Sequence, residues 1–173
     1  MHKDFELSNL IHLQNREDHL KCGILDFQNA FIGFSGWDIF SLLENPRIYF
    51  DDKYNDELIE YFFNNTNQYL SFDEFLTQYY FLNTARQSRI IGRWINLDKK
   101  DNNNYYSKYL HVTLKRLKKQ GYATVAVANE PPYSDIKSDG YVTGAAPDVA
   151  RAVLNILGVA ELKAEVIMYG AMI

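Results

Sequence analysis

Cysteine is nearly absent from this sequence, in which Cys22 is the single example among 173 residues. One cysteine cannot close an internal disulfide, and it gives no cysteine cluster for a structural zinc site. Because a free cysteine behaves as a small apolar residue, we expect Cys22 to be buried in a strand.

Long apolar runs and an excess of basic residues are missing as well. No segment approaches the roughly 18 consecutive apolar residues of a membrane span, and no basic segment followed by an apolar one marks a signal peptide at the N-terminus. The formal net charge of -4 gives no basic surface for nucleic acid or an anionic membrane. We therefore expect a cytoplasmic protein without nucleic-acid partners and without membrane insertion.

Residue usage changes abruptly near Gln120. Residues 1–120 contain thirteen Asn, two Ala and one Val, whereas residues 121–173 contain two Asn, ten Ala and seven Val. A basic helical pattern over Thr113–Lys119 leads directly into an apolar strand pattern, so we expect no flexible linker between the parts. We predict two domains, 1–120 and 121–173. The second falls below the size of about 60 residues at which a domain buries enough surface to be secure alone.

The first part is predicted to be a strand pair followed by helices. Apolar runs at Leu7–Leu13 and Cys22–Phe27 flank a polar segment of hairpin length. Ser71 and Glu74 form a capping box, which begins a long helix. The side chains expected on its inward stripe are Phe75, Leu76, Tyr79, Leu82, Ala85 and Trp94. Helical spacing predicts three shorter helices, over residues 37–43, 55–63 and 105–119.

The second part is predicted to run strand, hairpin, helix, strand, which is the start of a parallel α/β domain. Strands are expected over Thr124–Ala128 and Glu165–Tyr169, with a turn at Ser138–Gly140. Pro147 fits the first turn of the helix and Gly158 fits its end. The apolar face of that helix is expected to comprise Val149, Val153, Leu154 and Leu157. The whole chain is thus predicted to be α+β.

Three polar residues near the hairpin have the types and spacing that phosphoryl transfer requires. Asp4 stands five residues before Asn9 on a segment that enters the first strand, and Asp26 follows at the end of the second strand. One carboxylate would orient an attacking hydroxyl and accept its proton, while a carboxamide oxygen and a second carboxylate would hold magnesium at the nucleotide phosphates. Each residue alone is more often a turn or cap residue, so the hypothesis depends on the joint spacing.

Longer patterns surround these residues. They are His2-x-Asp4-x-x-x-x-Asn9, Asp26-Phe-Gln28, Gly36-Trp-Asp38 and Gln87–Arg93. Together they resemble the aminoglycoside phosphotransferase and choline kinase superfamily, and within it most closely the bacterial sugar kinases for N-acetylmuramate and N-acetylglucosamine. The resemblance covers about residues 1–119 and implies an α-rich, protein-kinase-like C-terminal lobe with a catalytic β-hairpin.

The roles of these positions follow from that resemblance. It implies Asp4 as the catalytic base, Asn9 and Asp26 as metal ligands, and His2 and Asp38 as structural support of the catalytic loop. The alternative for His2 is a partly exposed terminal residue. ATP and Mg²⁺ are the implied cofactors, and a sugar or amino sugar is the implied substrate. The family's N-terminal lobe would lie upstream of His2 and is expected to be absent, so we expect little or no kinase turnover.

A second set of patterns occupies residues 122–173. They are Ala128–Tyr133, Asp139–Gly144, Pro147–Val149 and Tyr169–Gly170. They resemble the start of a periplasmic solute-binding protein for polar amino acids or ectoine, which implies a truncated α/β (βαβ) fragment. Glu130 and Tyr133 are then implied as ligand contacts, with packing of Tyr133 against the hairpin as the alternative.

Three hypotheses about function remain open. The chain is a small-molecule phosphotransferase lobe, a fragment that binds a zwitterion such as an amino acid or ectoine, or a gene-fusion remnant or chimera without activity of its own. The two families work in different compartments, since one uses cytoplasmic ATP and the other requires export. This favours the third hypothesis for the isolated chain. Uncovered strand edges and apolar surface in both parts predict self-association.

Overall fold

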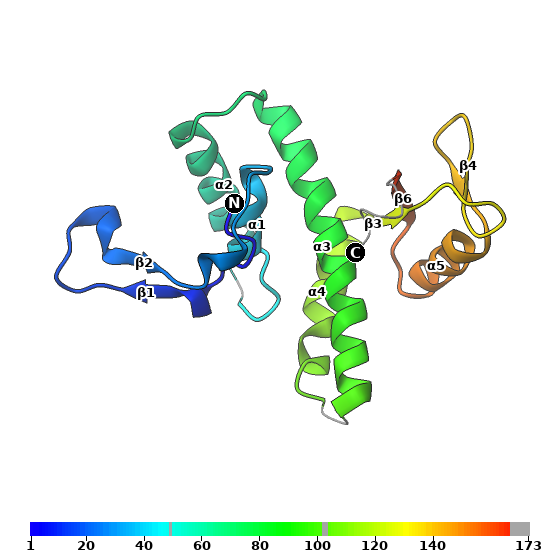
Figure 1. The fold of residues 1–173 in the computed structure, drawn as a ribbon, viewed down its shortest axis with the longest axis horizontal. Coiled ribbons are helices and arrows are strands. Elements are labelled where there is room, and N and C mark those ends of the chain that lie inside the picture. The colour runs from blue at the N-terminus through cyan, green and yellow to red at the C-terminus, as the bar shows by residue number, and fades with distance from the viewer. Residues whose placement is uncertain (49, 102–103, 167–173) are drawn as a thin grey trace. The chain divides into compact units, whose positions relative to one another are not determined.

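The computed structural model describes residues 1–48, 50–101 and 104–166 (Figure 1). In these residues helices predominate and three small two-stranded sheets form, which agrees with the predicted α+β class. The chain divides into two compact units, Met1–Tyr79 and Tyr80–Ile173, so the division falls inside the long helix α3. The domain boundary at 120/121 stays a prediction. Among the described residues, no helix is both long and apolar enough to span a bilayer.

The first unit is a hairpin followed by helices. Its elements are β1 (Leu10–His12), β2 (Cys22–Ile24), α1 (Gly36–Leu43), α2 (Asp52–Asn65) and the start of α3 (Phe72–Asp101). The strands pair antiparallel, with Leu10 opposite Ile24 and His12 opposite Cys22. Both strands are shorter than predicted, because Leu7–Asn9 forms a 3₁₀ turn and Asp26 takes a left-handed conformation just after β2.

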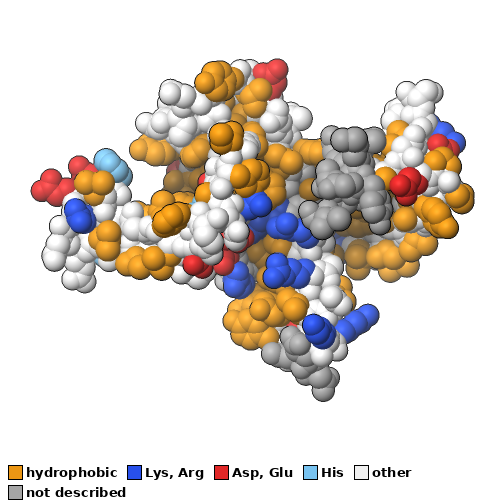
Figure 2. Space-filling view, viewed as in Figure 1, with side chains coloured by type: hydrophobic (Ala, Val, Ile, Leu, Met, Phe, Trp, Pro, Cys, Tyr) orange, Lys and Arg blue, Asp and Glu red, His pale blue; other side chains and the backbone are white. Residues whose placement is uncertain are grey.

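Cys22 lies in β2 but is exposed, so the prediction of a buried cysteine is wrong. Leu20, Ile24 and Phe27 are exposed in the same region. Figure 2 shows apolar side chains along the hairpin. Within the described residues of the first unit, the two strands form a sheet of their own, and most of their side chains stay open to solvent. The strand was therefore predictable from local sequence, whereas burial required a covering layer that local sequence does not report.

Aromatic rings form the core of the first unit. Phe40 of α1 and Phe75 and Tyr79 of α3 are fully buried. The ring centroids of Phe40 and Tyr79 lie 5.6 Å apart in an edge-on arrangement. The ring of Phe63, from α2, lies 5.3 Å from that of Phe75. Three helices are thus held together by rings at the distances where aromatic pairs attract.

The long helix α3 begins where the sequence predicts. Ser71 donates its N–H and its hydroxyl to the Glu74 carboxylate at 2.8 and 2.7 Å, which confirms the capping box. In the predicted inward stripe, three side chains are buried and three half-buried. They are, respectively, Phe75, Tyr79 and Trp94, and Leu76, Leu82 and Ala85. The stripe serves both units, because α3 continues from the first into the second.

The second unit combines the rest of α3 with a helix and a small α/β arrangement. Its further elements are α4 (Ser107–Gln120), β3 (Tyr122–Val127), β4 (Asp135–Ile136), β5 (Val142–Thr143), α5 (Ala145–Ile156) and β6 (Glu161–Val166). Strands β3 and β6 pair in parallel, with Tyr122 opposite Glu161, which confirms the order strand, hairpin, helix, strand. Strand β6 begins at Glu161 rather than at the predicted Glu165, and residues 167–169 of the predicted strand lie outside the described residues.

The predicted apolar face of α5 is only partly buried. Leu154 packs against the core of the unit and Leu157 is half-buried. Val149, Val153 and Ile156 are exposed, so part of the predicted apolar face is open to solvent. Figure 2 shows apolar side chains on the surface over α5. The physical reason is the size of the sheet, because the two strands β3 and β6 offer the helix too little surface to cover its whole apolar side.

The core of the second unit contains residues from both sides of the change in composition near Gln120. Its buried members are Leu117, Ala123 and Val159, against which Ile91 and Leu154 pack. Gly121 ends α4 in the left-handed conformation, with φ 81°, and its N–H donates to the Leu117 carbonyl oxygen at 2.9 Å. The chain is therefore continuously packed where the composition changes.

Candidate functional site

Asp38 anchors the segment that enters the hairpin. It lies in the first turn of α1, where the helix dipole favours a carboxylate. Its Oδ2 accepts the His2 N–H at 2.7 Å, and its Oδ1 accepts the Lys3 N–H at 3.1 Å. The Trp37 indole N–H donates to the Lys3 carbonyl oxygen at 3.1 Å. These bonds hold the two residues directly before Asp4.

His2 is buried, so the alternative of a partly exposed terminal residue is wrong. Its Nε2 lies 2.6 Å from the carbonyl oxygen of Leu25. A carbonyl oxygen can only accept, so the tautomer that fits carries its proton on Nε2. Leu25 is the neighbour of Asp26, and His2 therefore connects the segment before Asp4 to the end of the hairpin.

The hairpin brings Asn9 and Asp26 to one end. The Leu25 N–H donates to the Asn9 carbonyl oxygen at 2.9 Å, which extends the ladder beyond the strands. Asp26 follows with φ 58° and ψ 38°, a conformation that is strained for a non-glycine residue and that clusters at functional sites. The Asn9 side-chain N–H donates to the Asp4 carbonyl oxygen at 2.8 Å, so the amide oxygen Oδ1 is the side-chain atom of Asn9 that could coordinate a metal ion. The three predicted residues thus lie at the same end of the hairpin.

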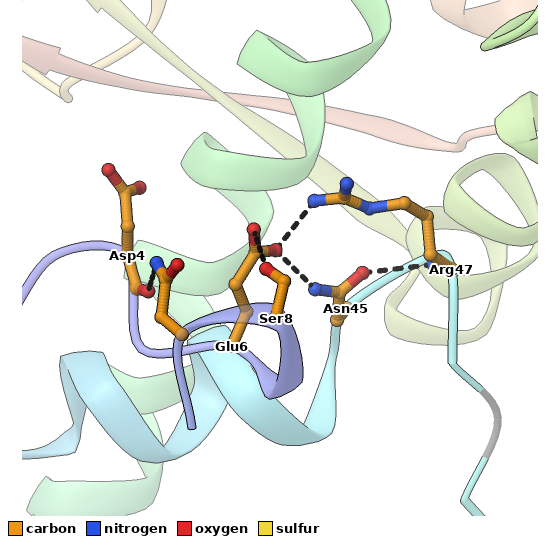
Figure 3. A network of polar contacts seen from close by, with 6 residues as sticks. Asp4, Glu6, Ser8, Asn45 and Arg47 are labelled. Atoms are coloured by element: carbon orange, nitrogen blue, oxygen red, sulfur yellow. Dashed lines mark hydrogen bonds and ion pairs between the residues drawn. The ribbon is translucent and has the colours of Figure 1, made fainter. Parts of the chain in front are cut away.

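Asp4 presents an exposed carboxylate, which points away from the neighbouring polar contacts in Figure 3. Among the described residues, no group of three or more His, Cys, Asp and Glu side chains is placed to hold a metal ion. Asn9 and Asp26 carry side-chain oxygens of the type that could supply two ligands of a magnesium ion. Mg²⁺ prefers oxygen ligands and commonly takes the remainder from phosphates and water.

A carboxylate inside the same loop was missed by sequence reasoning. The Glu6 carboxylate accepts hydrogen bonds from the Ser8 hydroxyl at 2.9 Å, the Asn45 side-chain amide at 2.7 Å and the Arg47 guanidinium at 2.6 Å (Figure 3). Asn45 and Arg47 follow α1, some forty residues along the chain from Glu6. Residues so far apart form no local sequence pattern. The sequence alone therefore shows Glu6 and Arg47 as two charged residues without indicating that they are partners.

Glu130 and Tyr133, the predicted ligand contacts of the second part, lie between β3 and β4. Glu130 pairs with Ser134 in an isolated β-bridge, and both predicted side chains are exposed. Tyr133 is 68% exposed, so the alternative of packing against the hairpin is wrong. Its carbonyl oxygen accepts the Ala146 N–H at 3.1 Å, which joins this segment to the start of α5. The Tyr169–Gly170 pattern lies outside the described residues.

Comparison with known proteins finds two partial similarities, and no family model matches the chain. The N-acetylmuramate/N-acetylglucosamine kinase of Caulobacter vibrioides is 27% identical over 109 residues, which are 63% of this chain and 30% of the kinase. A probable amino-acid ABC transporter periplasmic-binding protein of Sinorhizobium fredii is 50% identical over 48 residues, which are 28% of this chain and 16% of that protein.

One solved structure is also partly similar to this chain. The crystal structure of EhuB in complex with hydroxyectoine is 53% identical in the matched part, with a TM-score of 0.33, and the match covers 34% of this chain and 23% of that one. The chain thus spans less than a third of each of these three proteins. It carries weak partial similarity to a sugar kinase and to a periplasmic-binding protein, in line with the two resemblances in its sequence.

Proposed function

We propose that residues 1–119 form the catalytic-loop lobe of a small-molecule phosphotransferase that uses ATP and magnesium. The proposal rests chiefly on Asp38, whose two carboxylate oxygens hold the backbone of His2 and Lys3, directly before Asp4. The partial similarity to a sugar kinase supports the same reading and suggests a sugar or amino sugar as acceptor.

Each residue has one task in this proposal. The exposed Asp4 carboxylate orients the acceptor hydroxyl and takes its proton. Asn9, through Oδ1, and Asp26, through its carboxylate, bind the metal ion. When bound, magnesium neutralises charge on the nucleotide phosphates. His2 and Asp38 keep the loop in place from its two sides.

The proposal concerns nucleotide binding and the placement of the loop, and we expect turnover to be low. The match covers 30% of that kinase, and the proposal is limited to the matched part. Catalysis requires contacts that strengthen in the transition state, and a loop with one metal-binding pair provides few of them.

Calorimetric titration with ATP, with and without Mg²⁺, tests the proposal. We expect saturable, magnesium-dependent binding by the wild-type chain and its loss in Asp26→Ala. Asp18→Ala is the matched control, because Asp18 is also an exposed acid at positive φ in the same hairpin region. Binding that survives in Asp26→Ala would remove Asp26 from the metal site, and a folded wild-type chain without binding would refute the proposal.

A second candidate function concerns the solute-binding-like part. The 50% identity over 48 residues to a probable amino-acid periplasmic-binding protein favours recognition of an amino acid. The resemblance in the sequence adds ectoine as a related zwitterion. Glu130 and Tyr133 are exposed and available for such a ligand. Titration with amino acids and ectoine, using Tyr133→Ala beside the wild type, tests this. A folded chain that binds neither nucleotide nor zwitterion is the outcome expected of a fusion remnant without activity.

A further inference from the structure

The Glu6 network closes on itself around a buried amide. Asn45 is 2% exposed, its side-chain N–H donates to Glu6, and its Oδ1 accepts the Arg47 N–H at 3.0 Å. The Arg47 guanidinium returns to the same Glu6 oxygen at 2.6 Å. A buried amide donor needs an acceptor, and a carboxylate shared with an arginine is a strong one. Glu6 thus has a defined position relative to the end of α1.

This position lies midway along the loop that carries the proposed chemistry. Glu6 stands between Asp4 and Asn9, and its own carbonyl oxygen accepts the Asn9 N–H at 2.8 Å. The loop is therefore fixed at its start by Asp38, at its end by the hairpin ladder, and in the middle by Glu6. Among the described residues, other hydrogen bonds of the backbone between Asp4 and Asn9 lie within the loop, such as those from Asn9 to the Asp4 and Glu6 carbonyl oxygens.

We infer that Glu6, Asn45 and Arg47 are positioning residues, which set the distance between the proton-accepting Asp4 and the metal-binding Asn9. This inference rests on the proposed function for the meaning of that distance. The three side chains touch no reacting atom in this scheme. They act through the backbone of the loop, and their loss should reduce magnesium-dependent binding of nucleotide more than it reduces stability.

The Glu6–Arg47 pair suits this role because it is only half-buried. The Glu6 side chain is 19% exposed and that of Arg47 38% exposed, so the pair is partly screened by water. Substitution of Arg47 should therefore leave the unit folded while it removes one of the two long-range donors that hold the Glu6 carboxylate. Asn45 is the riskier target, because its replacement disturbs a buried site.

The first measurement is amide hydrogen exchange on the full chain, which needs no ligand. We expect exchange at the Asn9 N–H to be about tenfold faster in Arg47→Ala and Glu6→Ala, since local opening of the loop becomes easier. Glu6→Gln should restore most of the protection, because its carbonyl oxygen still accepts from Asn45 and Arg47. Lys53→Ala is the matched control, as it removes a cation from an exposed ion pair in the same unit.

The second measurement is the affinity for ATP with and without Mg²⁺ in the same variants. We expect Arg47→Ala to weaken the magnesium-dependent part selectively, with Arg47→Lys in between and Lys53→Ala unchanged. Unchanged Asn9 exchange in Arg47→Ala and Glu6→Ala would overturn the inference, whatever the nucleotide does. Faster exchange together with unchanged magnesium-dependent affinity would overturn the positioning role. A wild-type chain that binds no nucleotide refutes the proposed function, while faster exchange in the variants would still support fixation of the loop by Glu6.

Discussion

Asp38 accepts the backbone N–H of His2 across 36 residues of sequence, with 2.7 Å between donor and acceptor. Its second oxygen takes the N–H of Lys3, so one carboxylate satisfies two successive backbone donors. A carboxamide cannot do this, because one of its two polar atoms is itself a donor. Position 38 therefore requires Asp rather than Asn, because two acceptor oxygens are needed for the two backbone N–H groups.

Asp38→Asn should therefore destabilise the first unit. We expect a loss of about 1–3 kcal/mol in the free energy of unfolding, since one backbone N–H loses its acceptor. Urea unfolding, followed by tryptophan fluorescence in a Trp94→Phe background, measures this, because the remaining Trp37 lies in the same unit and bonds to Lys3. Asp56→Asn, at an exposed site of α2, is the control and should change little. Equal stability of Asp38→Asn and wild type would contradict the anchoring role.

Asp26→Gly distinguishes the backbone strain at this position from the proposed metal binding by the Asp26 carboxylate. Glycine adopts the left-handed conformation without a steric penalty, but it loses more backbone entropy on folding. The two effects oppose each other, so we expect the free energy of unfolding to stay within about 1 kcal/mol of wild type. Magnesium-dependent ATP binding, measured by calorimetry, should disappear. Retained binding in Asp26→Gly would show that the carboxylate holds no metal.

Gly144→Ala should disrupt the start of α5. Gly144 has φ 116°, and an added Cβ would lie 2.7 Å from the Tyr133 carbonyl oxygen. We expect a cost of about 2 kcal/mol or more, since both the backbone conformation and the close approach exclude a side chain. Gly92→Ala is the control, because an added Cβ there meets nothing within 4 Å on helix α3. That control should be stabilised by about 0.5–1 kcal/mol. Thermal unfolding compares the two, and a neutral Gly144→Ala would count against the packing described.

The start of α3 should weaken in acid. Hydrogen bonds from the Ser71 hydroxyl and N–H lower the pKa of Glu74 below its ordinary value of 4.5. A pKa lowered by folding stabilises the folded state above the unfolded-state pKa, and this contribution is lost as the pH falls through the folded-state pKa. Ser71→Ala removes the hydroxyl, the larger cause, and should move the pKa of Glu74 back upward. Carboxyl NMR titration of the wild type and of Ser71→Ala measures this. An unchanged Glu74 titration in Ser71→Ala would contradict the capping box.

Leu117→Ala should destabilise α4, which precedes the change in composition, and β3, which follows it, to a similar degree. Leu117 is buried in a core that Ala123 and Val159 share, and a cavity there costs about 2–5 kcal/mol. Ile95→Ala, at a partly exposed site of α3, should cost less than half as much. Hydrogen exchange should rise in α4 and β3 by similar factors. Faster hydrogen exchange in α4 alone would mean that the segments before and after Gln120 fold independently.

Features set by neighbouring residues were predictable from the sequence. The capping box needs only Ser71 and Glu74, and the order strand, hairpin, helix, strand follows from short patterns. Burial was harder to predict, because it depends on what covers an element. Cys22 and Val149 are apolar residues in the expected elements, yet both are exposed.

The candidate site shows the same difference. Local spacing predicted that Asp4, Asn9 and Asp26 belong together, because a hairpin joins its own ends. The bonds of Glu6 to Asn45 and Arg47 connect a loop to the segment after a helix, and no spacing rule links such positions. Long-range polar networks of this kind become visible only when the chain is folded.

The parallel pairing of β3 with β6 also sets an order of events during synthesis. Strand β3 ends at Val127 and its partner begins at Glu161, so β3 must wait until α5 has been made. Val159 completes the core around Leu117, and α4 therefore stays incompletely covered for the same interval. A ribosome releases the chain from its N-terminus, so the first unit is free to fold early while the second still exposes apolar surface. The nascent chain should therefore need chaperone protection most between the emergence of β3 and that of β6.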